Sequence, residues 1–160
     1  MSKKKIWIAL AIMVVVALVL TYLFYDQTTS DEYMPAEDEM ELHIQLNTKE
    51  DVGLLVFDYR ADDAEYSGGI SNANKSLLKQ NSDNVQIWNK QELDTYSDTV
   101  EMWIQFRVIT EYVEPNYENN YPEDITKYLY PISWKAQFGK SYYITITGDK
   151  ENGYKAVLNQ

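Results

Sequence analysis

Two short motifs in the middle of the chain are typical of acyl-transferring serine enzymes. Ser76 and Lys79 form an S-x-x-K pattern, and residues 82–84 read S-D-N. In such enzymes the serine and the lysine lie one turn apart on a helix, and a K-T-G strand completes the site. This chain has no K-T-G, and both motifs lie among turn-forming residues. On an extended strand Ser76 and Lys79 would face opposite sides, so we interpret the match as coincidence.

The chain contains almost no residues for histidine or cysteine chemistry. The chain has one histidine, His43, and no cysteine. His43 lies between Glu41 and Gln45 on the polar side of an alternating segment, with no nucleophile nearby in the sequence. A catalytic triad or a zinc site needs more of these residue types. We therefore expect His43 to be an exposed strand histidine.

One group of acidic residues is a weakly supported candidate for a metal site. The segment 58–65, at the end of an apolar run, supplies several carboxylates that could converge on Ca²⁺, which binds several oxygen ligands at once. Their spacing does not match the D-x-D-x-D-G loop. A calcium-stabilised structural domain is therefore one alternative, and no other cofactor is expected. Its candidate ligands are Asp58, Asp62, Asp63 and Glu65.

Carboxylate pairs also carry out glycoside hydrolysis. All 25 acidic residues follow residue 25, so some of them must lie close together by chance. The sequence singles out no pair. A surface-anchored, glycan-acting hydrolase is therefore a second alternative, beside the main expectation of a non-catalytic protein.

The segment 111–134 is the most unusual part of the chain because it combines six aromatic residues with five acids and one lysine. Tyrosine supplies a large contact area at a low cost in conformational entropy, and long loops often carry function. We expect the part 111–126 to contact a partner and Tyr117 and Tyr121 to be exposed, whereas Tyr128 and Tyr130 should pack beneath the loop. The candidate binding residues are Tyr112, Tyr117, Asn120 and Tyr121.

The elements that would position these residues are strands. Apolar and polar residues alternate over 40–46 and 99–113, and a continuous apolar run over 52–60 predicts a central strand. The segment 127–134 is interrupted by Pro131, which indicates an edge or irregular segment. Glycines flank a hairpin between the last two strands. Further strands are expected at 76–80, 84–90, 141–147 and 154–158.

These strands predict an all-β domain over residues 39–160. Their number and spacing suit an antiparallel β-sandwich of immunoglobulin-like or related type. About 120 residues suffice for one core without disulfides.

The beginning of the chain predicts a membrane anchor. Residues 6–25 carry no charge, and a helix of this length spans about 30 Å, the thickness of the bilayer core. The basic segment 1–5 precedes it, so the positive-inside rule leaves the N-terminus in the cytoplasm and the rest outside. A cleaved signal peptide is the rival, but its apolar region usually covers only about 7–15 residues. The acidic segment 26–38 is expected to be a stalk.

The charge of the chain limits its partners. The net charge is −11, and every acid follows the predicted anchor. Such a surface repels nucleic acid. We therefore expect a single-pass, membrane-anchored binding or assembly module outside a bacterial cytoplasm, whose partner is another protein or the cell surface.

Overall fold

The computed structural model describes residues 34–116, 118 and 120–159 of the chain. The described residues belong to one compact unit, Met34–Gln160. The predicted cytoplasmic segment 1–5, the predicted membrane helix 6–25 and the stalk residues 26–33 lie outside them. In the part of the chain that is described, no helix has the length and apolarity needed to cross a membrane.

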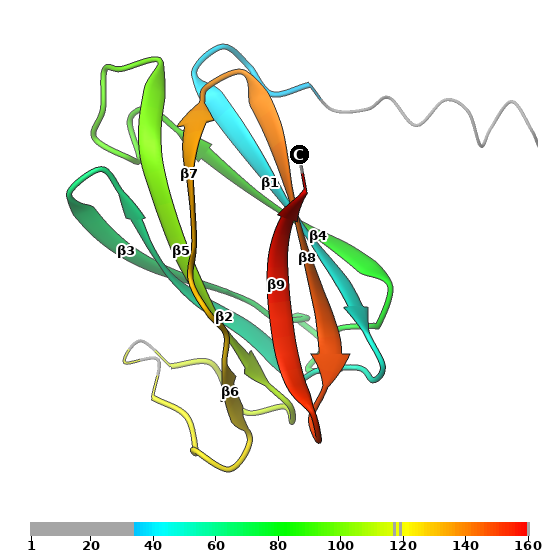
Figure 1. Ribbon diagram of the computed structural model, residues 1–160. Coiled ribbons are helices and arrows are strands. Elements are labelled where there is room, and N and C mark those ends of the chain that lie inside the picture. The colour runs from blue at the N-terminus through cyan, green and yellow to red at the C-terminus, as the bar shows by residue number, and fades with distance from the viewer. Residues whose placement is uncertain (1–33, 117, 119, 160) are drawn as a thin grey trace, which may run out of the picture. The chain divides into compact units, whose positions relative to one another are not determined.

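The described residues form strands arranged in two sheets (Figure 1). The four-stranded sheet has the order β4-β1-β8-β9, and the five-stranded sheet has the order β3-β2-β5-β6, with β7 also paired to β5. The expected all-β class is confirmed for these residues, and the two sheets are consistent with a β-sandwich. The strands are β1 Glu39–Thr48, β2 Leu54–Ala61, β3 Ala64–Ile70, β4 Ser82–Asn89, β5 Thr99–Ile109, β6 Thr126–Tyr128, β7 Ile132–Gln137, β8 Lys140–Asp149 and β9 Gly153–Asn159.

One pairing between the described strands is parallel, so the expected antiparallel arrangement holds for the other pairings but is wrong for this one. β1 and β8 run side by side in the same direction, from Met40 opposite Lys140 to Thr48 opposite Gly148. A parallel pair requires a long connection, and here most of the domain lies between the two strands. Alternation along a single strand carries no signal of the direction of its neighbour, which is why the sequence did not predict this pairing.

The core lies between the two sheets and follows the predicted alternation of β1 and β5. Phe57 of β2 meets Phe106 of β5 there, with ring centroids 5.7 Å apart. Burial of such apolar side chains is the main source of stability in a domain without disulfides. The inward side chains of the two alternating strands are at most 2% exposed and comprise Met40, Leu42, Ile44 and Leu46 in β1 and Val100, Met102, Ile104, Phe106 and Val108 in β5.

One predicted strand was wrong, and one strand was missed. The segment 76–80 is not a strand, because only Leu78 pairs, in an isolated bridge with Val52. β3 was not predicted, because its two glycines lower its strand propensity and it follows an acidic stretch. β3 forms a tight hairpin with β2, whose turn contains Asp62 with a φ of 52°. Asp tolerates this left-handed conformation.

Pro131 interrupts the strand as predicted, but the tyrosines before it are exposed and not buried. β6 and β7 lie on either side of Pro131, and both pair with β5. Tyr128 and Tyr130 are 67% and 91% exposed, so the expectation that they pack beneath the loop is wrong. Leu129 takes the buried position between them, at 2% exposure.

The two glycines of β3 face opposite sides of the five-stranded sheet. Gly68 lies opposite Phe57, and a Cβ on Gly68 would come within 2.7 Å of the Phe57 ring. Gly69 faces outward, and its nearest heavy atom to such a Cβ would be the Leu55 carbonyl oxygen at 3.4 Å, an ordinary contact. Neither glycine has a positive φ. Gly68 is therefore required by packing, whereas Gly69 is not.

We predict that Gly68→Ala lowers the free energy of unfolding by about 1–3 kcal/mol, because the methyl group overpacks a rigid, buried ring. Gly69→Ala is the matched control, and it should change stability by less than about 1 kcal/mol. Urea unfolding of the two variants measures both values. Equal effects at the two positions would contradict the assignment of the inner and outer faces of β3.

Candidate functional site

β2 is apolar on both of its faces, which is unusual for a strand with a solvent side. Leu55 and Phe57 enter the main core, while Leu54 and Val56 face the other way. The two outward side chains join Ile109 of β5 in a second buried cluster on the outer face of the five-stranded sheet. This cluster is at most 2% exposed. An apolar patch on an outer sheet face needs a cover.

The cover is supplied by residues 110–125, which we call the covering loop. Val113, Tyr121 and Ile125 from this loop pack against the outer cluster. The loop is closed at its base by a hydrogen bond from the Thr110 amide to the Ile125 carbonyl, at 2.9 Å. It starts directly over Gly53, where a Cβ would lie 1.9 Å from the Glu111 carbonyl oxygen.

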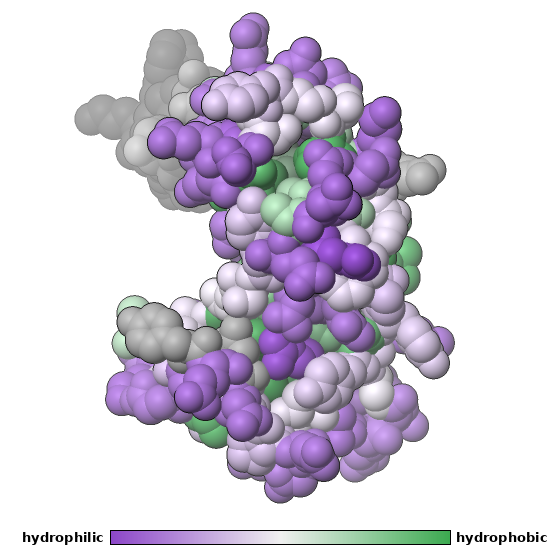
Figure 2. Space-filling view, turned by 90° about the vertical axis from the view of Figure 1, so that its left-hand side faces the viewer, coloured by the Kyte–Doolittle hydropathy of each residue, from purple (hydrophilic) through white to green (hydrophobic). Residues whose placement is uncertain are grey.

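A groove of about 260 Å³ separates the covering loop from β3. Its floor and one wall are formed by residues 54–56 of β2 and 67–71 in and after β3, and its other wall by Pro115, Asn116 and Tyr121. Because Gly69 faces outward without a side chain, the floor stays open. Figure 2 looks onto the β3 side of the molecule, where hydrophilic side chains dominate and hydrophobic ones show only between them. We call this hollow the β3 groove.

The predicted binding residues contribute unequally to the groove. Tyr121 lines it and is half-buried, so the expectation of an exposed Tyr121 is wrong: its ring is needed to cover the outer cluster. Asn120 exchanges two hydrogen bonds with Asn116, at 3.1 and 3.2 Å, and thereby fixes the groove wall. Tyr112 instead donates to Glu114, which also pairs with Lys75. Tyr117 lies outside the described residues.

Asn116 is the residue of this site that sequence reasoning missed. Besides its bonds to Asn120, its backbone N–H donates to the Tyr121 hydroxyl at 3.4 Å. The spacing of asparagines in "NYENN" was the available signal, because asparagine side chains often bond to the backbone in turns.

The calcium candidates Asp58, Asp62, Asp63 and Glu65 are distributed over the β2–β3 hairpin. Asp58 accepts two hydrogen bonds from Arg107 Nη2, at 3.0 and 3.1 Å. Asp62 accepts the Glu101 amide at 2.9 Å and thereby joins the turn to β5. Among the described residues, no three Asp, Glu, His or Cys side chains are grouped so that they could hold a metal ion. Calcium binding stays a prediction.

His43 lies in a polar cluster on the outer face of the four-stranded sheet, so the expectation of an exposed histidine is wrong. Its Nδ1 is 2.6 Å from Asp83 Oδ2 and its Nε2 is 3.1 Å from Glu41 Oε2. The ring also stacks on Tyr143, with centroids 4.6 Å apart. Ser141 donates to Glu41 rather than to His43, which is not the order of a catalytic triad.

The two carboxylates decide the protonation of His43. Burial of the ring lowers its pKa, but hydrogen bonds to Asp83 and Glu41, together with their negative charges, raise the pKa above the ordinary 6.5. Because a carboxylate faces each ring nitrogen, both nitrogens are donors when the cluster is intact.

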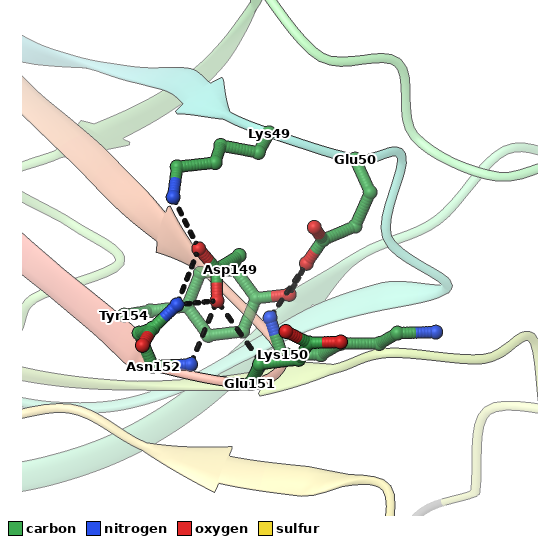
Figure 3. A network of polar contacts seen from close by, with 7 residues as sticks. All are labelled: Lys49, Glu50, Asp149, Lys150, Glu151, Asn152 and Tyr154. Atoms are coloured by element: carbon green, nitrogen blue, oxygen red, sulfur yellow. Dashed lines mark hydrogen bonds and ion pairs between the residues drawn. The ribbon is translucent and has the colours of Figure 1, made fainter.

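A second polar network joins the β1–β2 connection to the β8–β9 hairpin (Figure 3). The Asp149 carboxylate accepts Lys49 Nζ at 2.5 Å and the Asn152 amide at 2.7 Å. Glu50 accepts the Lys150 amide at 2.8 Å and also binds the Tyr154 hydroxyl. The hydrogen bond from Lys49, followed by that from the Asn152 amide, lowers the pKa of Asp149 to about 2. These groups satisfy one another, so we interpret the network as structural.

Comparisons with known proteins show only distant likenesses. No protein-family model and no curated protein sequence matches the chain. A protein from Eubacterium rectale is 10% identical with a TM-score of 0.40, over 77% of this chain and 90% of that one. A non-hemolytic pneumolysin from Streptococcus pneumoniae is 9% identical with a TM-score of 0.39, over 76% of this chain and 23% of that one. Listeriolysin O is 7% identical with a TM-score of 0.39, over 76% of this chain and 22% of that one. The chain thus spans less than a quarter of either toxin.

We predict that His43→Gln removes a pH dependence of stability. The folded pKa of His43 lies above its unfolded value near 6.5. The cluster therefore stabilises the fold fully below about pH 6.5 and loses this contribution as the pH rises through the folded pKa. The difference in free energy of unfolding between wild type and variant should shrink as the pH rises above about 6.5 and through the folded pKa. A difference that stays constant from pH 6.5 upward would contradict the prediction.

We predict that Asp149→Asn removes a stabilising contribution that is present at neutral pH and lost in acid. The folded pKa of Asp149 is about 2, below the ordinary 3.8. Its stabilising contribution is therefore present above about pH 4 and is lost as the pH falls toward 2. The variant should be less stable than wild type at neutral pH, and acid titration of urea unfolding should bring the two together. Asp63→Asn, in the exposed β2–β3 turn, is the control. If the stability of Asp149→Asn depended on pH in the same way as that of Asp63→Asn, the Asp149 network would not stabilise the fold.

Proposed function

We propose that the chain is a non-catalytic binding module that is anchored in the membrane by residues 6–25 and holds its β domain outside the cytoplasm. We further propose that the domain takes its partner, a protein or a component of the cell surface, in the β3 groove. The charge-free segment 6–25 and the lysines before it support the anchor and its orientation. The partner site is supported by the geometry of the groove.

One observation carries the assignment of the groove. Gly69 faces outward beside Val56 and Tyr121, and its missing side chain leaves a hollow with an apolar floor on an otherwise hydrophilic side of the domain. Packing does not require glycine there, since a Cβ would make only ordinary contacts. A concave, partly apolar site with a few fixed polar groups is the usual form of a binding site. Asn116 supplies such a polar group at the rim.

Photo-crosslinking in intact cells tests this function. A photoreactive side chain replaces Ser67, which lines the groove, or Lys155 on the other sheet as a control. We predict a discrete adduct from position 67 only. Gly69→Leu should lower its yield about tenfold or more by filling the groove, whereas Gly69→Ala should retain most of it. A position-67 adduct that is insensitive to Gly69→Leu, or an equal adduct from position 155, would contradict the proposal.

A further inference from the structure

β3 ends the five-stranded sheet on the side of the groove. Among the described residues β3 pairs with β2 alone, and no other strand lies against its outer edge. Every second residue of an edge strand directs its N–H and C=O groups away from the sheet. These backbone groups are available to an added strand.

The edge lacks the usual protection against such an addition. Natural edge strands are commonly guarded by lysine, proline or a bulge. β3 carries its single charge, Glu65, near its start, and the following residues "YSGGIS" contain neither a charge nor a proline. The β2–β3 register is also continuous from Leu55–Ile70 to Ala61–Ala64, without a bulge.

The groove lies where an added strand would place its side chains. A neighbouring strand runs about 4.8 Å from β3, and alternate side chains point to the outer face of the sheet. There they would meet the open floor at Gly69 and the half-buried ring of Tyr121. The groove therefore fits one apolar side chain of an extended segment that is bound by its backbone to β3.

The covering loop, which supplies the far wall through Pro115, Asn116 and Tyr121, is acidic, and this indicates the charge of that segment. The described part of the covering loop contains five acidic residues and no basic one. Lys75 neutralises one of them by pairing with Glu114. A basic partner would be attracted by the remaining acids, and an acidic one would be repelled. The acidic residues are Glu111, Glu114, Glu118, Glu123 and Asp124.

We propose that the partner binds as an extended, basic peptide segment, which adds a strand to the outer edge of β3 and seats an apolar side chain in the β3 groove. This inference rests on the proposed function and names the chemistry of its partner. The backbone bonds to β3 would provide affinity, and the groove and the acidic loop would provide selectivity.

The probe is the capped, fluorescent peptide Thr-Lys-Thr-Leu-Thr-Lys-Thr, tested by anisotropy with the full chain in detergent. In an extended conformation its leucine and two lysines share one face. We expect binding below about 1 mM that weakens about tenfold or more when glutamate replaces lysine, or when Gly69→Leu fills the groove. Val157→Leu, at an exposed position of β9 on the other sheet, is the control and should bind as wild type does.

Two N-methylated isomers of the probe test the backbone pairing. One isomer carries methyl groups on the backbone nitrogens of the even-numbered residues, and the other carries them on those of the odd-numbered residues. Only one set of nitrogens faces β3, so one isomer should lose binding about tenfold or more while the other keeps it. Equal binding of both isomers, or no binding of the unmethylated probe, would overturn strand addition. The proposed function would survive either result if the Ser67 adduct still depended on Gly69.

Discussion

The organisation of the five-stranded sheet depends on β2 being apolar on both faces. Its inward side chains complete the core against β5, and its outward ones, Leu54 and Val56, must also be removed from water. Burial of this second face requires the covering loop, which begins at the close contact over Gly53 and lays Tyr121 on the outer cluster. The β3 groove follows from the same arrangement, because the loop covers the cluster but leaves the space above Gly69 open.

Charge has a different role from apolar burial in this domain. Ion pairs join strands that are distant in sequence, such as Asp58 with Arg107 and Lys49 with Asp149. In each pair one partner is well exposed to solvent, which weakens the attraction between the charges. We therefore attribute most of the stability to the core and regard the polar clusters as determinants of local geometry and of pH dependence. In the covering loop Glu114 is paired with Lys75, and the proposed binding would use the other acidic residues to select a partner by charge.

The sequence predicted those features that are encoded locally. Alternation over 40–46 identified β1, and the predicted strand 99–113 identified β5 but ran four residues past its end at Ile109. Both patterns gave the inward side chains, because the period of a strand is visible within a few residues. β3 was missed because glycine usually disfavours a strand. Gly68 is suited to this strand only because the Phe57 ring packs against it across the hairpin. The partners of His43 come from β4 and β8, and the parallel register of β1 with β8 is equally non-local. The sequence singled out the tyrosine-rich segment, yet Gly69 and Asn116, which shape the groove, become apparent only once the sheet and the loop are placed together.

Hydrogen–deuterium exchange of the full chain tests the central claim, that the β3 groove is the binding site, most directly. Exchange would be followed by mass spectrometry in native membranes of the producing cells and after purification in detergent. If the groove is occupied in the cell, amides of residues 64–71 and of the covering loop should exchange more slowly in the membranes, while those of β9 should not change. Unchanged exchange in both groove segments, or protection confined to the other sheet, would contradict the account.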